Sequence, residues 1–63
     1  MKNKIAEYRK KIGMSQQELA DKAKIARPYL SYIENGKQEV IGSDVMFRIA
    51  DALNVPYHEI FLR

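Results

Sequence analysis

The side chains that could carry out covalent or metal chemistry are few in this sequence. His58 is the only histidine, and the serines Ser15, Ser31 and Ser43 have no histidine at a spacing that would supply a general base. The chain contains no cysteine, which excludes a disulfide or a thiolate metal site. We therefore expect no catalytic residue, no enzyme activity, no metal and no cofactor, and a His58 side chain at the surface.

Another set of residues could bind a partner without reacting with it. Pro28 and Tyr32 are one helical turn apart, and Arg27, Tyr29 and Ser31 flank them. At helical spacing Pro28 and Tyr32 point away from the apolar residues of the same segment. This segment therefore offers an outward face that combines polar and aromatic side chains.

Basic residues are concentrated in the half of the chain that contains this face. Residues 1–37 hold nine Lys and Arg against four Asp and Glu, whereas residues 38–63 hold two against four. The first part thus carries +5 and the second −2, in agreement with the net charge of +3. Such asymmetry is typical of a protein that binds a polyanion, and it is equally compatible with an ordinary solvated, lysine-rich surface.

Two short helices with a tight corner between them must position the outward face. Ser15 followed by Glu18 is typical of a capping box, which predicts a helix over 15–23. Proline is tolerated in the first turn of a helix, so Pro28 predicts a second helix over about 27–34, which Asn35-Gly36 would end. Two helices joined this tightly form a helix-turn-helix.

The N-terminal residues predict a helix over 2–12 that ends at Gly13. The residues at helical spacing that would face the core are Ile5, then Tyr8 or Arg9, then Ile12, and we call such a row the stripe of a helix. A buried charge must be paired, so Arg9 at this place needs an acidic partner. The charged character of this segment excludes a signal peptide or a membrane span, and we expect a cytoplasmic protein.

A fourth helix is predicted after an N-cap at Ser43, and Asn54 ends it. Its buried stripe is Met46, Ile49, Ala50 and Leu53. A last short turn over 57–61 closes the core with Val55, Ile60 and Phe61, and leaves Tyr57 and Leu62 as an outer apolar patch. No segment alternates as a strand. We therefore expect one all-α domain of five helices over residues 1–63, with the marginal stability of so short a chain.

Several segments match one known family in order and spacing. They are Arg9, residues 13–20 (GMSQQELA), residues 30–37 (LSYIENGK), residues 48–53 (RIADAL) and residues 55–61. On these segments the chain resembles the Cro/phage-repressor type of helix-turn-helix domain, often called Xre-like, over nearly its whole length. The resemblance implies a compact five-helix, lambda-repressor-like domain. In this fold the second helix braces the third in the major groove of DNA.

The resemblance also implies roles for individual residues. Arg27, Pro28 and Tyr32 fall on the family's base-facing positions, and we expect the flanking Tyr29 and Ser31 to face the bases with them. Gln16, Asn35 and Lys37 fall on its phosphate-contacting positions, and we expect the neighbouring Gln17 to contact phosphate as well. Arg9 and Glu34 match a partly buried structural ion pair, which would supply the partner that Arg9 needs.

Three departures from the family pattern concern the cap, the base readers and the linker. Ala26 stands where the family has Ser or Thr, so we expect the third helix to lack a side-chain cap, at a typical cost of ~1 kcal/mol. The third helix has no Gln or Asn to read adenine, and Arg27 alone has the fork that suits guanine. The linker after Lys37 is longer than usual, and Val40 or Ile41 would fill the core position there.

The resulting hypothesis is a sequence-specific regulator of transcription, most simply a repressor, that binds double-stranded DNA at a near-palindromic operator. Relatives often dimerise through the C-terminal helix, and we expect a homodimer here, with no membrane or metal partner. The alternative is a protein-interaction module on the same fold, such as an antitoxin or adaptor. The aromatic residues Tyr29 and Tyr32 and the lack of amide base readers favour that alternative.

Overall fold

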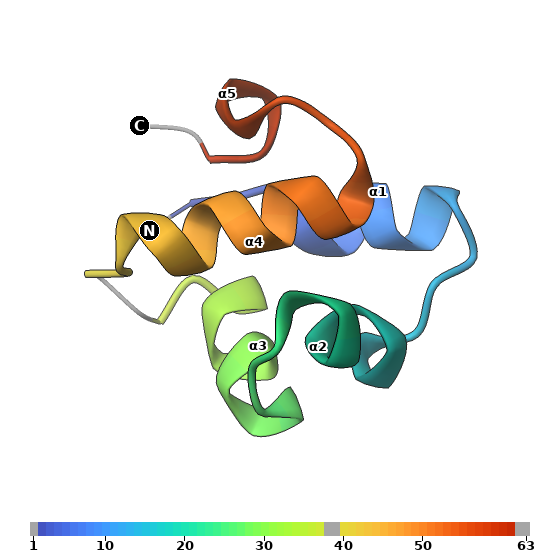
Figure 1. Ribbon diagram of the computed structural model, residues 1–63, viewed down its shortest axis with the longest axis horizontal. Helices are drawn as coiled ribbons and strands as arrows, with labels where there is room; N and C mark the ends of the chain where they lie inside the picture. Colours follow the sequence, from blue (N-terminus) through green and yellow to red (C-terminus); the bar gives the residue numbers. More distant parts are fainter. Residues whose placement is uncertain (1, 38–39, 62–63) are drawn as a thin grey trace.

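The longest helix, α4 (Ser43–Leu53), runs through the middle of the molecule (Figure 1). The computed structural model describes residues 2–37 and 40–61. On one side of α4 lie α2 (Gln16–Ala23) and α3 (Arg27–Glu34), and on the other lies α5 (Tyr57–Ile60). The remaining helix, α1 (Ile5–Lys11), also packs against α4. These described residues form five helices and no strand, which confirms the predicted all-α fold.

Apolar side chains from all five helices form one core. The largest fully buried ones are Ile5, Leu19, Leu30, Ile33, Ile49 and Ile60. The predicted stripe of α4 is confirmed, because all four of its members are buried. The space between Lys37 and α4 is filled by Ile41, which is 7% exposed, whereas Val40 is 80% exposed. The spacing alone had left the choice between these two residues open.

The start of α2 is fixed by the predicted capping box. The Glu18 backbone N–H donates to Ser15 Oγ at 3.1 Å, and the Ser15 N–H donates to Glu18 Oε1 at 2.9 Å. The hydrogen bond from the Ser15 backbone, together with that of its side chain, lowers the pKa of the Glu18 carboxyl. The stabilisation by this carboxylate is therefore present above its unfolded-state pKa and is lost as the pH falls through the lowered folded-state value.

The corner between α2 and α3 is made by a lysine in the left-handed region. Lys24 has φ 60° and ψ 46° and ends α2, and its backbone N–H reaches the carbonyls of the last turn. Glycine is the residue that usually takes this place, because it has no Cβ to crowd the next carbonyl. The corner is therefore built at a local cost in backbone strain.

Replacing Lys24 with glycine is expected to stabilise the fold by about 0.5–1 kcal/mol. Relief of a left-handed L-residue contributes about 1–2 kcal/mol, and the greater unfolded-state freedom of glycine and the lost charge at the helix C-terminus offset part of it. Thermal unfolding followed by circular dichroism measures the change. Asn54→Gly is the matched control, because Asn54 ends α4 at φ 58° and asparagine tolerates this region, so its gain should be smaller. A loss of stability in Lys24→Gly would contradict the expectation.

Two expectations about the helix boundaries were wrong. First, α1 is shorter than the predicted 2–12, and Ile12, its C-cap residue, is 55% exposed. The left-handed Gly13 (φ 70°) ends the helix as predicted, and Arg9 takes the last buried position of the stripe. Second, the N-cap of α4 is Gly42 and not Ser43, because the Gly42 carbonyl accepts the first helical hydrogen bond, from Met46 N–H. A Cβ at residue 42 would lie 2.7 Å from Asp44 Oδ1, so a larger residue here would require the exposed Asp44 side chain to move.

The two ends of the described chain lie side by side. Lys4 N–H donates to the Ile60 carbonyl at 2.8 Å, and Asn3 forms an isolated bridge with Phe61. Tyr8 Oη donates to Glu59 Oε1 at 3.1 Å, and this hydrogen bond raises the pKa of Tyr8. The predicted closing residues Ile60 and Phe61 are buried, and Val55 is half-buried against the core.

Candidate nucleic-acid interface

The outward face of α3 is open to solvent. Arg27, Pro28 and Tyr32 are exposed, the last with 48% of its surface accessible, and Pro28 and Tyr32 lie on the side of the helix opposite the buried Leu30 and Ile33. The two residues predicted beside them are less accessible. Ser31 and Tyr29 are half-buried, and the Tyr29 ring packs against the core. Arg27, Pro28 and Tyr32 are therefore the accessible members of the predicted set, and Tyr29 and Ser31 are less accessible.

The N-terminus of α3 has no side-chain cap, as expected from Ala26. Ala26 is extended (φ −72°, ψ 141°), and Pro28 lies in the first turn, where its fixed φ suits the helix. The first N–H groups of such a helix have no partner within it, and they carry the positive end of the helix dipole. A phosphate group can satisfy them.

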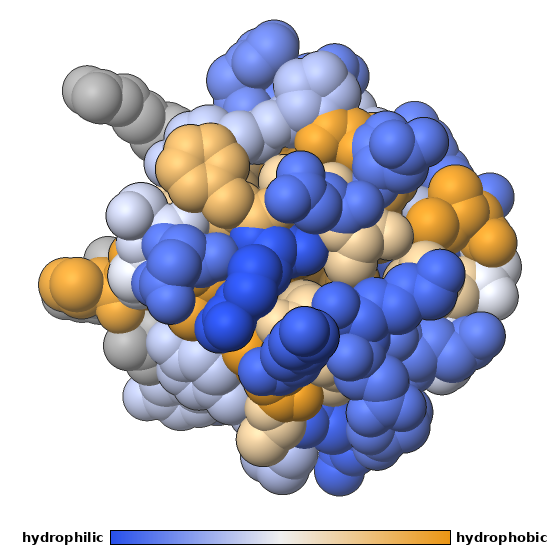
Figure 2. Space-filling view, in the orientation of Figure 1, coloured by the Kyte–Doolittle hydropathy of each residue, from blue (hydrophilic) through white to orange (hydrophobic). Residues whose placement is uncertain are grey.

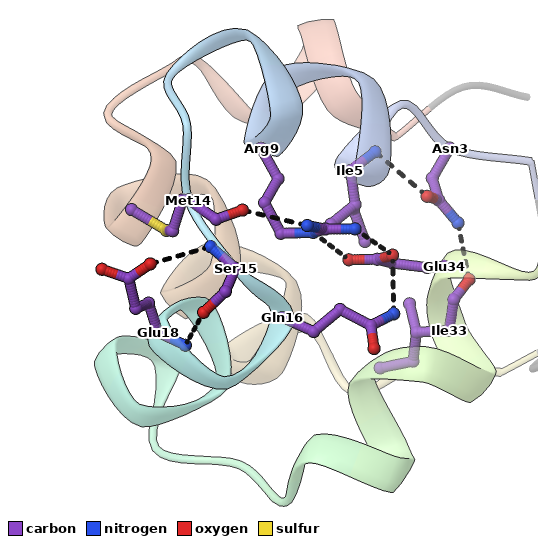
Figure 3. Close-up of polar contacts among 9 residues, drawn as sticks. All are labelled: Asn3, Ile5, Arg9, Met14, Ser15, Gln16, Glu18, Ile33 and Glu34. Atoms are coloured by element: carbon purple, nitrogen blue, oxygen red, sulfur yellow. Dashed lines mark hydrogen bonds and ion pairs between the residues drawn. The ribbon is translucent and has the colours of Figure 1, made fainter.

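Arg9 and Glu34 form the predicted ion pair between α1 and α3 (Figure 3). Arg9 Nε lies 2.8 Å from Glu34 Oε2 and Arg9 Nη2 lies 3.1 Å from Oε1, which is the two-bond geometry that a guanidinium makes with a carboxylate. The third arm of the guanidinium, Nη1, donates to the Met14 carbonyl at 2.9 Å. The side chains are only 11% and 5% exposed. The pair therefore fixes the last turn of α3 against the loop that leads into α2.

Gln16 joins the same network from the first turn of α2. Its Nε2 donates to Glu34 Oε1 at 3.0 Å, and Figure 3 shows the side chain directed toward the carboxylate. The amide group thus has an internal partner, a role that the sequence did not suggest because it depends on how α2 and α3 cross. Gln17 is exposed and donates to Asp21 Oδ1 at 2.9 Å. Of the two glutamines, Gln17 is the one whose side chain is on the surface.

Asn35 and Lys37 follow α3 and are both exposed. Asn35 is the C-cap residue, and Gly36 takes the left-handed conformation (φ 72°) that turns the chain away from the helix. Asn3, whose importance the sequence did not indicate, supports this end of α3. Its Nδ2 donates to the Ile33 carbonyl at 2.8 Å (Figure 3), so the N-terminal segment holds the last turn of α3 in place.

Within residues 2–37 and 40–61, no three His, Cys, Asp or Glu side chains are close enough together to hold a metal ion. His58 is exposed, as predicted. The longest helix in these ranges is too short to cross a membrane.

Five helices in this order, with α2 and α3 joined at a tight corner and α3 open on its outer face, define the class of helix-turn-helix domains. Residues 5–60 match the helix-turn-helix family model. The chain belongs to this family, in its Cro/phage-repressor, Xre-like group, as the motif residues had indicated.

Named relatives and solved structures support this assignment. An uncharacterized HTH-type transcriptional regulator of Archaeoglobus fulgidus is 32% identical over 98% of this chain and 87% of its own length. The HTH-type transcriptional regulator SinR of Bacillus subtilis is 38% identical over 87% of this chain, which spans only 50% of the SinR sequence. The structure of the SinR N-terminal DNA binding domain superimposes with a TM-score of 0.80 at 38% identity, covering 87% of this chain and 80% of that one.

Two further structures share the fold. SinR in complex with DNA gives a TM-score of 0.81 at 38% identity and 87% coverage of both chains. The restriction-modification controller protein C.AhdI of Aeromonas hydrophila gives 0.85 at 28% identity, with 92% of this chain and 86% of that chain covered. The predicted fold class is thereby confirmed.

Proposed function

We propose that residues 1–63 act as one DNA-binding domain that reads duplex DNA with α3 and regulates transcription, most simply as a repressor. The observation that carries this proposal is the accessible face of α3, where Arg27, Pro28 and Tyr32 stand on a helix held rigidly by the Arg9–Glu34 pair. The relatives are transcriptional regulators, and SinR has been solved on DNA, which supports the same use of this face here.

In this proposal α3 lies in the major groove. Arg27 donates to a guanine edge through its forked guanidinium, and Tyr32 and Pro28 contact thymine methyl groups or adjoining sugars. Tyr29 and Ser31 border the contact. Phosphates on either side are held by the N-terminal N–H groups of α2 and α3, by Gln16 and Gln17, and by Asn35 and Lys37. For Gln16 the backbone N–H is the better placed group, since its side-chain amide already binds Glu34.

The DNA-bound form is proposed to be a homodimer that forms through the C-terminal part of the chain. Phe47 of α4 is 52% exposed and its ring lies 4.9 Å from that of Tyr57, which in turn lies 5.4 Å from that of Phe61. Of these three rings only Phe47 is exposed, since Phe61 is buried and Tyr57 is half-buried against the core rather than outside it as predicted. Phe47 is therefore the apolar side chain that this end of the molecule offers to a second copy. Leu62, the other member of the predicted outer patch, lies outside the described residues. A two-fold dimer would bind half-sites about 34 Å apart on a near-palindromic operator.

The domain is proposed to act in the cytoplasm, by occupying DNA, without a cofactor and without a catalytic step. The relatives' role as transcriptional regulators supports this mode of action. The alternative of a protein-interaction module was favoured by two outward aromatic residues. Of these two residues, Tyr32 is exposed, whereas Tyr29 is half-buried against the core. The outward aromatic surface is therefore smaller than expected, which weakens the case for a protein-interaction module.

Selection of bound duplexes from a random pool tests the proposal. We expect a near-palindromic consensus with half-sites about one helical turn apart. The affinity for that duplex should fall with salt, with a slope of log K against log salt concentration of roughly −0.9 for each phosphate contact. An asymmetric single site would overturn the dimer but leave DNA binding in place. No retardation of any duplex at low salt would favour the interaction module instead.

A further inference from the structure

A groove of about 350 Å³ lies between α2 and α4, and it is lined mainly by cations. The lining residues are Lys22 and Lys24 from the end of α2, and Arg48, Asp51 and Ala52 from α4. We call this set the basic groove. Figure 2 shows strongly hydrophilic side chains gathered in the middle of this view, where Figure 1 shows α4 above α2. None of the lining residues belongs to α3, so the groove is separate from the face that is proposed to read bases.

The three cations of the basic groove are available to an external partner. Lys22, Lys24 and Arg48 are exposed, and the ion pair found within residues 2–37 and 40–61 joins Arg9 and Glu34 instead. Three cations against the single carboxylate of Asp51 give the groove a local charge of +2. It therefore attracts a negatively charged group.

Lys24 holds its place in the groove in an unfavourable backbone conformation. Its φ of 60° is one that glycine adopts without cost and that an L-residue adopts only at a cost. Strained residues cluster at binding sites, which agrees with a binding role for this groove. The backbone N–H of Lys24 donates to carbonyls of the last turn of α2. These hydrogen bonds fix the position of the Lys24 Cα at the end of the groove.

We infer that the basic groove docks an acidic segment of a protein partner, an extended stretch that carries at least two carboxylates. Carboxylates would pair with the lysines and Arg48, while a backbone N–H of the segment donates to Asp51. Ala52, which is half-buried, offers apolar contact at the same place. A DNA backbone fits less well, because its phosphodiester groups offer no hydrogen-bond donor to the Asp51 carboxylate, whereas a peptide offers its backbone N–H groups. A partner bound in the basic groove would leave the outward face of α3 open, so this protein could bind DNA and the partner at the same time.

The test is a titration of the whole chain, isotope-labelled, with a short peptide of alternating Glu and Ser, followed by amide NMR shifts. Shifts are expected at Lys22, Lys24 and Ala52, and not along α3. The double variant Lys24→Gly/Arg48→Gln should bind the peptide about tenfold more weakly, because each exposed ion pair contributes a few-fold in affinity. This variant should remain folded, since the first change relieves strain and the second is on an exposed position.

The matched control removes the same charge elsewhere. Lys4→Gln/Lys10→Gln takes two exposed cations from the region of α1 and should leave peptide affinity within about twofold. An equal loss of peptide affinity in both double variants would overturn the inference, because peptide binding would then depend on the net charge of the protein alone. NMR shifts confined to α3 would also overturn it, since the peptide would then bind the face that is proposed to bind DNA.

The titration contains no DNA, so its failure is distinguishable from a failure of the proposed DNA binding. A duplex-binding loss in Lys24→Gly/Arg48→Gln as large as its peptide loss would assign the groove to DNA and reject the protein partner.

Discussion

Glu34→Gln is expected to remove a large part of the stability of the fold. The change removes the counter-charge of Arg9, whose side chain is 11% exposed and cannot regain full hydration in the folded state. Breaking a buried ion pair by removing one partner costs about 3–5 kcal/mol. A domain of this length has a total unfolding free energy of about 3–9 kcal/mol, so the loss takes up much of it. Urea unfolding followed by circular dichroism measures the difference.

Two comparison variants separate this effect from others. Glu7→Gln removes an exposed carboxylate from α1 and should change the unfolding free energy by less than about 0.5 kcal/mol. The double variant Arg9→Met/Glu34→Leu removes both charges and should recover part of the loss, because no unpaired ion is left behind. Recovery should be incomplete, since Gln16 Nε2 and the Met14 carbonyl lose their partner atoms. A Glu34→Gln protein as stable as Glu7→Gln would show that the pair is solvated and contributes little.

Arg27→Ala is expected to remove discrimination at one base pair of the selected duplex. A guanidinium that binds guanine through two hydrogen bonds contributes about 1–3 kcal/mol of discrimination, or roughly 5–150-fold in affinity between the right and wrong pair. Titration of the variant with the selected duplex and with its single-pair substitutions measures this quantity. Affinities for the different duplexes should converge at the position that Arg27 reads and remain separated elsewhere.

The control is Arg48→Ala, which removes the same side chain from an exposed position on α4. It should preserve discrimination at every base pair, whatever its effect on overall charge. If Arg27→Ala instead weakened all duplexes by the same factor, Arg27 would contact phosphate, and the base-reading role would have to pass to Tyr32 or to the shape of the DNA.

Local rules predicted the features that depend on neighbouring residues. Ser15 and Glu18 are close enough in sequence for their spacing to fix the capping box, and Asn35-Gly36 likewise predicted the end of α3. The Arg9–Glu34 pair joins distant residues. It was nevertheless predicted. The spacing put Arg9 beside the apolar residues of the first helix, where its charge requires an acidic partner, and the family resemblance identified that partner as Glu34.

Features that depend on how helices cross were not predictable from spacing. The internal hydrogen bond of Gln16 exists only because the start of α2 meets the end of α3. Ile12 was assigned to a stripe that continues past the actual end of α1. Phe47 was overlooked because its partner ring, Tyr57, comes from another helix. The DNA sequence that the protein prefers cannot be predicted from residue spacing either. Arg27 and Tyr32 determine which chemical groups face the DNA, but not which bases lie opposite them.

The pairing of residues 3 and 4 with residues 60 and 61 bears on how the molecule assembles. Closing a loop of that length costs more chain entropy than forming the short connections between successive helices. We therefore expect α2, α3 and α4 to collapse together first and the N-terminal segment to dock late in folding. The same reasoning makes that segment the earliest to open during thermal fluctuations. Its amide hydrogens should accordingly exchange with solvent faster than those of the central helices.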